Sequence, residues 1–209
     1  MRLILASTSP RRKELLSLLQ IEFEVIEPVF VERIRPDVPP IDQARLFAEG
    51  KARACVDRFP ESVIIGSDTL IELNGEVLGK PRTLSEAGSM LRRLRRCAHQ
   101  IHTAVALCHT ARFHETSVET VRAWVKDLSE REIDRYLMTE ESMGKAGAYA
   151  IQGYGGSLID RIEGDYTAAV GLPLRRLVSM LQRRGVIMPI SIEELYRKKP
   201  YPNWARFAS

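Results

Sequence analysis

The sequence predicts an α/β domain built on a mixed, curved β-sheet that is flanked by helices. Strand-like and helix-like segments alternate along the 209 residues, with no internal repeat and no low-complexity linker. Hydrophobic residues make up 44% of the chain and charged residues 28%, which is typical of a globular protein with a sizeable core. An Asn-Gly pair between two apolar runs adds a strong signal for a β-hairpin.

Apolar runs bounded by turn residues predict the strands, and hydrophobic periodicity following N-terminal caps predicts the helices. The expected strands cover residues 2–6, 23–26, 62–73, 76–78, 100–108 and 116–126, with further short strands among the glycines of 147–170. The expected helices cover residues 10–20, 42–59, 84–94, 129–138 and 173–185.

Capping residues set the start of each predicted helix. Ser9 precedes a proline, which suits the first helical position, and Asp42 can cap the second helix. Residues 83–86 and 129–132 are capping boxes, in which a hydroxyl and a glutamate three residues apart satisfy free backbone donors. Gly50 weakens the middle of the second helix by about 1 kcal/mol relative to alanine.

The predicted hairpin turns at residues 74–75 and brings two polar regions together. Counting back from a two-residue turn sets Thr69 opposite Lys80, so Lys80 lies beside the pair formed by Asp68 and Thr69. In ideal register Lys80 shares a face with Thr69 and not with Asp68. A bulge or a strong twist would be needed to bring Lys80 and Asp68 together.

Composition excludes several classes of protein. The net charge of +4 suits an anionic small molecule and is too weak to indicate a nucleic-acid binder. The apolar runs are far shorter than the ~20 residues of a membrane span. Three scattered cysteines without a CxxC pair imply neither a disulfide framework nor a zinc site, so we expect a cytoplasmic protein. An RNA-binding module using the arginines of 92–96 stays an alternative to a solvated helix face.

The first candidate for chemistry is the segment 7–13, where a strand runs into the start of a helix. Free N–H groups and the helix dipole favour an anion at this position. Arg11, Arg12 and Lys13 oppose the same dipole, and a bound phosphate chain would turn that repulsion into attraction. The alternative is a hydroxyl-capped helix with solvated arginines.

Three further polar residues are candidates. Asp68 lies inside an apolar strand, where a buried carboxylate needs a divalent metal or a cationic side chain; otherwise it faces solvent. Gln152, in the glycine-rich segment 145–156, offers a donor and an acceptor for the edge of a base, although such a segment can also be a simple turn. Glu32 stands alone in a loop, where a carboxylate is usually solvated.

At these residues the chain resembles the Maf family of nucleoside triphosphate pyrophosphatases, over about residues 2–184. One matching block would be weak evidence for the family, but five blocks in this order are specific evidence. The blocks are residues 5–12, 66–69, 79–81, 145–147 with 151–153, and 170–174.

The resemblance implies hydrolysis of a nucleoside triphosphate between its α and β phosphates, with a divalent metal, Mg²⁺ or Mn²⁺, as cofactor. It also implies a homodimer and a two-lobed fold with a central cleft, related to inosine triphosphatases. Asp68 matches the proton acceptor and, with Glu32, a metal ligand. The positions that match the surroundings of the triphosphate are Ser7, Arg12, Lys51 and Lys80.

Within the family, one branch prefers dTTP and UTP and another prefers 7-methyl-GTP. The chain resembles the dTTP/UTP branch at Arg11, Thr69 and Gln152. Val31 and Gly144 stand where many members have acidic residues. This difference leaves open a non-catalytic nucleotide-binding regulator of septum formation.

The resemblance divides the chain into a nucleotide pyrophosphatase domain over 1–185 and a C-terminal extension over 186–209. The extension has no counterpart in the family pattern. Ser191 can cap one more helix there, and residues 201–204 indicate an irregular, docked tail.

Overall fold

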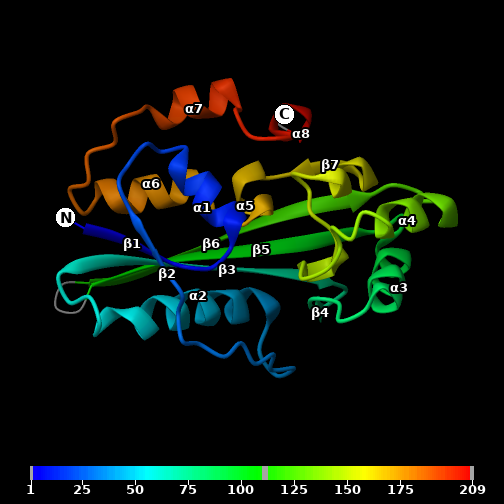
Figure 1. The fold of residues 1–209 in the computed structure, drawn as a ribbon, viewed down its shortest axis with the longest axis horizontal. Coiled ribbons are helices and arrows are strands. Elements are labelled where there is room, and N and C mark those ends of the chain that lie inside the picture. Colours follow the sequence, from blue (N-terminus) through cyan, green and yellow to red (C-terminus); the bar gives the residue numbers. More distant parts are fainter. Residues whose placement is uncertain (1, 110–112, 208–209) are drawn as a thin grey trace.

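The computed structural model describes residues 2–109 and 113–207 and shows a seven-stranded mixed sheet in this part of the chain (Figure 1). The strand order is β2-β1-β3-β5-β6-β7, and β4 pairs with β3 beside this path. β1 runs parallel to β2 and β3, whereas the remaining pairs are antiparallel. The strands are β1 Arg2–Ala6, β2 Glu24–Ile26, β3 Ser62–Leu73, β4 Glu76–Leu78, β5 Ala98–His109, β6 Phe113–Val125 and β7 Ile159–Glu163.

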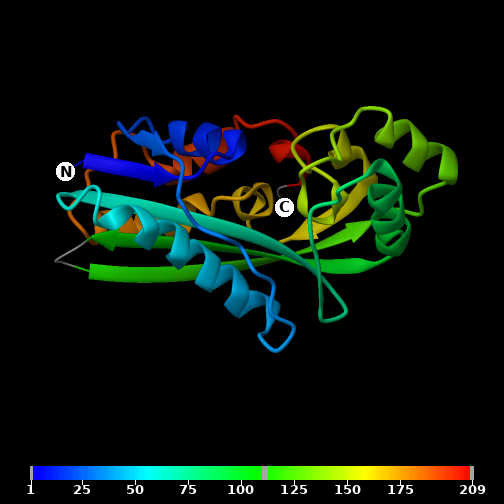
Figure 2. The ribbon, with the colours of Figure 1, turned by 60° about the horizontal axis from the view of Figure 1, so that its bottom comes forward.

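Helices cover both faces of this sheet (Figures 1 and 2). They are α1 Pro10–Ser17, α2 Pro40–Val56, α3 Leu84–Leu94, α4 Glu130–Leu137, α5 Tyr166–Val170, α6 Leu174–Gln182, α7 Ile192–Lys198 and α8 Trp204–Phe207, with short 3₁₀ turns η1 Ala146–Ala148 and η2 Tyr154–Leu158. α2 lies on one face, and α1, α5 and α6 lie on the other. The predicted α/β class with a mixed, helix-flanked sheet is confirmed, and its division into two lobes stays a prediction.

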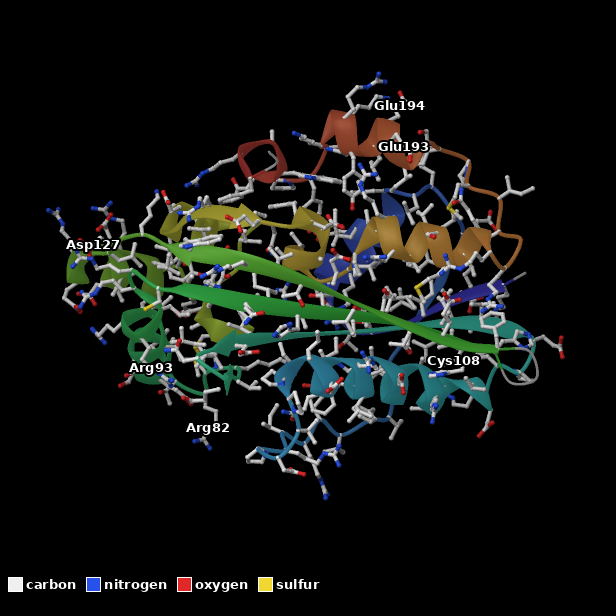
Figure 3. The ribbon with its side chains drawn as sticks, turned by 180° about the vertical axis from the view of Figure 1, so that it is seen from behind. Arg82, Arg93, Cys108, Asp127, Glu193 and Glu194 are labelled. Carbon is white, nitrogen blue, oxygen red and sulfur yellow. The ribbon has the colours of Figure 1, made fainter. Side chains whose placement is uncertain are left out.

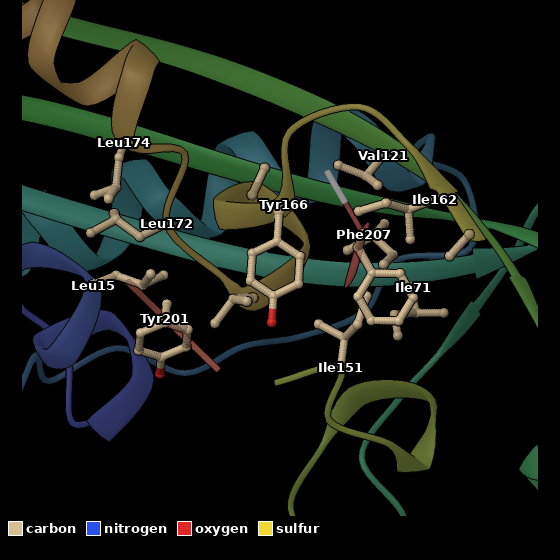
Figure 4. Close-up of a cluster of buried hydrophobic side chains, with 14 of the residues drawn as sticks. Leu15, Ile71, Val121, Ile151, Ile162, Tyr166, Leu172, Leu174, Tyr201 and Phe207 are labelled. Atoms are coloured by element: carbon tan, nitrogen blue, oxygen red, sulfur yellow. The ribbon is translucent and has the colours of Figure 1, made fainter. Parts of the chain in front are cut away.

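Each face of the sheet has its own hydrophobic core. Ala44, Ala48 and Ala52 of α2 pack with alternate residues of β1, β3 and β5 in the smaller core. The larger core lies on the opposite face and joins the other helices to the sheet; Figure 4 shows part of it around Tyr166 and Leu172. Because successive strand residues point to opposite faces, neighbouring residues on β3 reach different cores.

Among the described residues, one edge of β3 is paired only at its two ends. β1 pairs with it as far as Gly66, and β4 pairs with it from Ile71 to Leu73. Residues 67–70 lie between these two partners, and their other edge pairs with β5. Asp68 and Thr69 therefore lie on a short open edge in the middle of the sheet, between the end of β1 and the hairpin.

Several expected boundaries are wrong for identifiable reasons. α2 begins at Pro40 with Pro39 as its cap, because proline already suits the first helical position, and Asp42 lies inside the first turn. Ser9 occupies the N-cap of α1 but makes no side-chain capping bond. The glycine-rich segment 147–170 contains one strand, two 3₁₀ turns and α5 rather than a series of strands.

The segment after α6 folds back over the domain. Ser191 caps α7, as predicted, by accepting a hydrogen bond from the Glu194 amide. Figure 3 shows Glu193 and Glu194 on the outer side of this helix. Trp204 in α8 is only 1% exposed, so the tail is docked. The proposed division at residue 185 stays a prediction.

The arginines of α3 are used in surface ion pairs. Arg92 and Arg95 contact Glu130, and Arg93, labelled in Figure 3, contacts Glu76 at 2.5 Å. Paired arginines present less unbalanced positive charge, which weakens the RNA-binding alternative. Within the described residues, every helix is too short or too polar to cross a membrane.

Candidate active site

A cavity of about 530 Å³ opens at the free edge of β3. Its walls are the start of α1, the loop before α2, the end of the β3–β4 hairpin and the segment 144–152. Among the described residues that line it, five are cationic and three are acidic, namely Arg11, Arg12, Lys51, Lys80 and Lys145 against Glu27, Glu32 and Asp68. The cavity therefore suits a ligand with several negative charges.

Arg12 lies across the floor of the cavity and joins three segments. Its Nε donates to the carbonyl of Gly171 at 3.0 Å, and its two terminal nitrogens reach Ser7 Oγ and Thr69 Oγ1, each at 3.4 Å. Thr103, opposite Thr69 on β5, donates to Thr69 Oγ1 at 3.0 Å. The two 3.4 Å contacts are long, so the guanidinium retains donor capacity for an anion.

Asp68 points to the other face of β3, where a chain of alternating charges begins. Lys51 of α2 donates a short hydrogen bond to Asp68 Oδ1, and its Nζ lies 2.6 Å from Glu32 Oε1. Glu32 Oε2 lies 3.5 Å from Lys80 Nζ. Asp68 is only 4% exposed, so the expectation of a buried, partnered carboxylate is confirmed and the solvent-facing alternative is wrong.

Two glycines allow these charges to meet. A Cβ on Gly66 would lie 2.2 Å from the carbonyl oxygen of Ala48, so only glycine permits α2 to pack this closely on β3. A Cβ on Gly50 would lie 2.1 Å from the ring of Phe30. The loop carrying Phe30 therefore lies directly on α2, which brings Glu32, two residues later, to Lys51.

The two carboxylates have different acidities. Burial raises the pKa of Asp68 above its ordinary value, and the charges of Lys51 and Arg12 only partly offset this. Burial also disfavours ionisation of Glu32, but the hydrogen bond and charge of Lys51 outweigh it and hold the pKa of Glu32 below its usual range. Burial thus makes Asp68 a stronger base than an ordinary aspartate, whereas Lys51 makes Glu32 a weaker base than an ordinary glutamate.

These carboxylates also fit a divalent cation in the presence of phosphate. Asp68 Oδ2 is buried and has no hydrogen-bond partner among the described residues. The second carboxylate, Glu32, is joined to Asp68 through Lys51, whose ammonium group contacts both. No cluster of three or more potential ligands occurs in residues 2–109 and 113–207. Mg²⁺ commonly takes one or two carboxylates and completes its shell with phosphate oxygens and water, so the pair suits this ion.

The opposite wall of the cavity is the segment 144–152, and Glu141 holds the backbone that directly follows it. Glu141 Oε1 accepts a hydrogen bond from the amide of Tyr154 at 3.0 Å, and Glu141 Oε2 accepts one from the amide of Gly155 at 2.8 Å. A Cβ on Gly153 would lie 1.8 Å from Glu141 Oε1, so glycine is needed there. This arrangement places Gln152 on the cavity wall, half-buried.

The structure brings together every site residue that the sequence predicts, since all of them line the cavity: Ser7, Arg11, Arg12, Glu32, Lys51, Asp68, Thr69, Lys80 and Gln152. The position of Lys80 relative to the hairpin differs from the prediction. β4 ends at Leu78, so Lys80 has left the ladder and reaches Glu32 without a bulge, while Thr69 pairs with Thr103.

Sequence reasoning gives no role to two residues that shape this site. Lys145 lines the cavity, where burial lowers its pKa and the positive charge of Arg11 lowers it further. Its place within a matched motif is the signal that could have identified it. Glu141 organises the wall that carries Gln152. No local pattern distinguishes Glu141 from a surface carboxylate.

The fold and the cavity define an α/β protein with a cation-rich cavity at an open edge of its sheet. The Maf-like protein family model matches residues 2–184. The chain belongs to this family.

Similar proteins are known by sequence and by structure. The dTTP/UTP pyrophosphatase of Bacillus velezensis is 44% identical over 185 residues, covering 88% of this chain and 97% of that protein. The dTTP/UTP pyrophosphatase of a Geobacillus strain is 42% identical, with 88% and 98% covered. The Ham1 protein of Staphylococcus aureus has a TM-score of 0.51 at 14% identity, with 88% of this chain and 97% of that chain covered. A HAM1 protein of Coxiella burnetii has a TM-score of 0.52 at 15% identity, with 88% and 99% covered. The two solved structures share the fold.

Proposed function

We propose that this protein hydrolyses dTTP and UTP to the nucleoside monophosphate and pyrophosphate. The observation that carries the proposal is the buried Asp68, paired with Lys51 through one oxygen and without a partner on the other among the described residues. Such a carboxylate at the floor of a cationic cavity can accept a proton beside a bound phosphate chain. The names of the relatives support this substrate class.

The cations of the cavity hold the triphosphate. Arg12 is held by Gly171, Ser7 and Thr69, and Lys51 and Lys80 both contact Glu32. Ser7 accepts from the Ser9 amide at 3.2 Å and orders the turn that leads into α1. Phosphoryl transfer depends mainly on positioning and on charge neutralisation, and these side chains supply both.

Asp68 takes the proton of the attacking water. The water oxygen forms a bond to the α-phosphorus, the α–β anhydride bond breaks, and pyrophosphate leaves with the bonding electrons. A divalent cation, held by Asp68 and Glu32 together with phosphate oxygens, would neutralise charge and ease deprotonation of water. The raised pKa of Asp68 makes it a better proton acceptor than an exposed aspartate.

The base is selected at the opposite wall. Gln152 can pair with the donor and acceptor of a uracil or thymine edge, while Arg11 and Thr69 line the approach to it. A non-catalytic nucleotide-binding regulator is not favoured, because the relatives are named as pyrophosphatases. The homodimer implied by the family resemblance stays a prediction.

A panel of nucleotides tests the proposal. The purified protein is incubated with dTTP, UTP, dCTP, ATP and GTP in the presence of Mg²⁺ or Mn²⁺, and pyrophosphate and orthophosphate are measured separately. We expect pyrophosphate in equal amounts with the monophosphate, fastest from UTP and dTTP. Release of orthophosphate, or nucleotide binding without turnover, would contradict the proposal.

A further inference from the structure

The C-terminal segment, residues 186–207, lies outside the matched family region and contacts both helix α1 and the loop that carries Gln152. Its aromatic residues are part of the large core. Trp204 and Phe207 stack on Tyr166 with ring centroids 5.8 and 6.1 Å away, and Figure 4 shows Phe207 and Tyr201 in the same cluster as Tyr166. These buried rings therefore fix the end of the segment on the domain.

Asn203 contacts the backbone on either side of Gln152. Its Nδ2 donates to the carbonyl of Ile151 at 2.9 Å and to the carbonyl of Gly153 at 3.0 Å. One amide group thus fixes the two residues that flank Gln152. A Cβ on Gly156 would lie 2.5 Å from Asn203 Nδ2, so the loop leaves space for this side chain.

The same segment contacts the wall that carries Arg11. Tyr201 donates a hydrogen bond to Glu14 Oε2 on α1 at 2.5 Å. Glu14 lies three residues after Arg11, on the neighbouring turn of the same helix face. Only one residue separates Tyr201 from Asn203, so this short stretch links α1 to the Gln152 loop.

We propose that the C-terminal segment positions the base-recognition residues, with Asn203 as the positioning residue for Gln152. This inference rests on the proposed function, because it assigns the segment to the pyrimidine site of that reaction. A recognition loop held in its binding conformation loses less entropy when the base binds. The segment thus contributes to substrate affinity without touching the phosphate chain.

Asn203→Gly tests this role against a matched control. Asn203 has φ of +60°, which glycine adopts easily, so the variant removes the amide without straining the backbone. Arg206→Ala is the control, because Arg206 also donates to two carbonyls, of Gly156 and Ile159, but to neither neighbour of Gln152. Deletion of the whole segment is avoided, since it would expose Tyr166.

For UTP hydrolysis, Asn203→Gly should raise KM about fivefold or more and change kcat less than about twofold. Arg206→Ala should change both less than about twofold. In a Gln152→Ala background, Asn203→Gly should have no further effect on KM, because it acts through Gln152. Equal effects of the two variants, or an undiminished effect in that background, would overturn the positioning role.

Hydrogen exchange separates this inference from the proposed function, since it needs no turnover. Asn203→Gly should increase amide exchange over residues 150–154, and Arg206→Ala should not. Unchanged exchange over 150–154 in Asn203→Gly would overturn the role even for an active enzyme. If the wild-type protein releases no pyrophosphate, the proposed function fails while increased exchange still supports the positioning of Gln152.

Discussion

The ring of Phe30 lies on helix α2 at Gly50, where a Cβ would come within 2.1 Å of the ring. The same ring makes an edge-on contact with Phe47, one turn earlier, with centroids 6.0 Å apart. Phe30 thus anchors an otherwise exposed loop. Glu32 follows it in that loop and reaches Lys51, so a glycine that weakens the helix is needed to assemble the charges of the site.

Gly50→Ala should lower both stability and activity. Helix propensity alone predicts a gain of about 1 kcal/mol in the free energy of unfolding, because alanine is the better helix former. The collision with Phe30 should instead lower the free energy of unfolding. Because the collision also displaces Glu32, it should raise the metal concentration needed for half-maximal pyrophosphate release. Chemical denaturation and a metal titration measure the two effects.

Gly88→Ala is the matched control for this substitution. Gly88 also lies within a helix, but the nearest atoms to its added Cβ are side-chain ends of Arg92 and Leu137, at 3.1 and 3.2 Å. We expect unchanged metal dependence in this variant. If Gly50→Ala proved as stable and as active as Gly88→Ala, the role of Phe30 in placing Glu32 would be wrong.

Asp68→Asn should reduce turnover about 100-fold or more, because the amide cannot accept the proton of the attacking water. The amide nearly preserves the shape of the side chain, so thermal unfolding should show a folded protein. Asp160→Asn, on the exposed side of β7, is the control and should keep wild-type turnover. Wild-type pyrophosphate release by purified Asp68→Asn would exclude this residue as the proton acceptor.

The acidity of Asp68 predicts the acid limb of the pH–rate profile. Asp68 must be ionised to accept a proton, so kcat should fall as the pH drops through its pKa. Burial raises this pKa, and therefore the limb should lie above the ordinary aspartate value of 3.8. The charge of Lys51 lowers the same pKa, so Lys51→Met should move the limb to higher pH. A limb that shifts to lower pH in Lys51→Met would contradict the assignment.

Gln152→Glu should weaken recognition of uracil and thymine more than hydrolysis in general. A carboxylate only accepts hydrogen bonds, so it cannot donate to the carbonyl oxygen of a pyrimidine. We expect kcat/KM to fall more for UTP than for GTP, both measured as pyrophosphate release. An unchanged ratio of the two values would remove Gln152 from the base site.

Local sequence signals predict most of the framework. The Asn-Gly turn at 74–75 correctly sets Leu73 opposite Glu76, and both capping hydroxyls, Thr83 and Ser129, accept the expected backbone bonds. These features depend on residues only a few positions apart, so local sequence patterns can predict them. The same reasoning fails in 147–170, where contacts with Glu141 and the C-terminal segment decide the backbone path.

The chemistry of the site is only partly readable from local pattern. The strand position of Asp68 indicates a buried carboxylate that needs a partner, but nothing near it identifies Lys51, which comes from a helix on one face of the sheet. Glu32 has no periodic context at all, and its place depends on Phe30 lying on Gly50. Family resemblance supplies these residues because it reflects the assembled site rather than any single segment.

His99 is another buried titratable group, in contact with the cavity-lining residue Tyr149. It is 2% exposed, and its Nε2 lies 2.7 Å from the hydroxyl of Tyr149. Its Nδ1 has no hydrogen-bond partner within the described part of the chain. Burial lowers the pKa of His99 from 6.5 to about 4, so the imidazole is neutral in the folded protein at pH 7.

This lowered pKa predicts a loss of stability in mild acid. Between pH 6.5 and about 4 the unfolded chain binds a proton at His99 and the folded protein does not, so the free energy of unfolding falls with pH across this window. The full contribution is about 3 kcal/mol. Urea denaturation at pH 7 and pH 4 should show this loss in the wild-type protein and a smaller loss in His99→Gln, which does not titrate. His114→Gln, at an exposed histidine of β6, is the control and should keep the wild-type loss. Equal losses in His99→Gln and the wild type would show that His99 does not control acid stability.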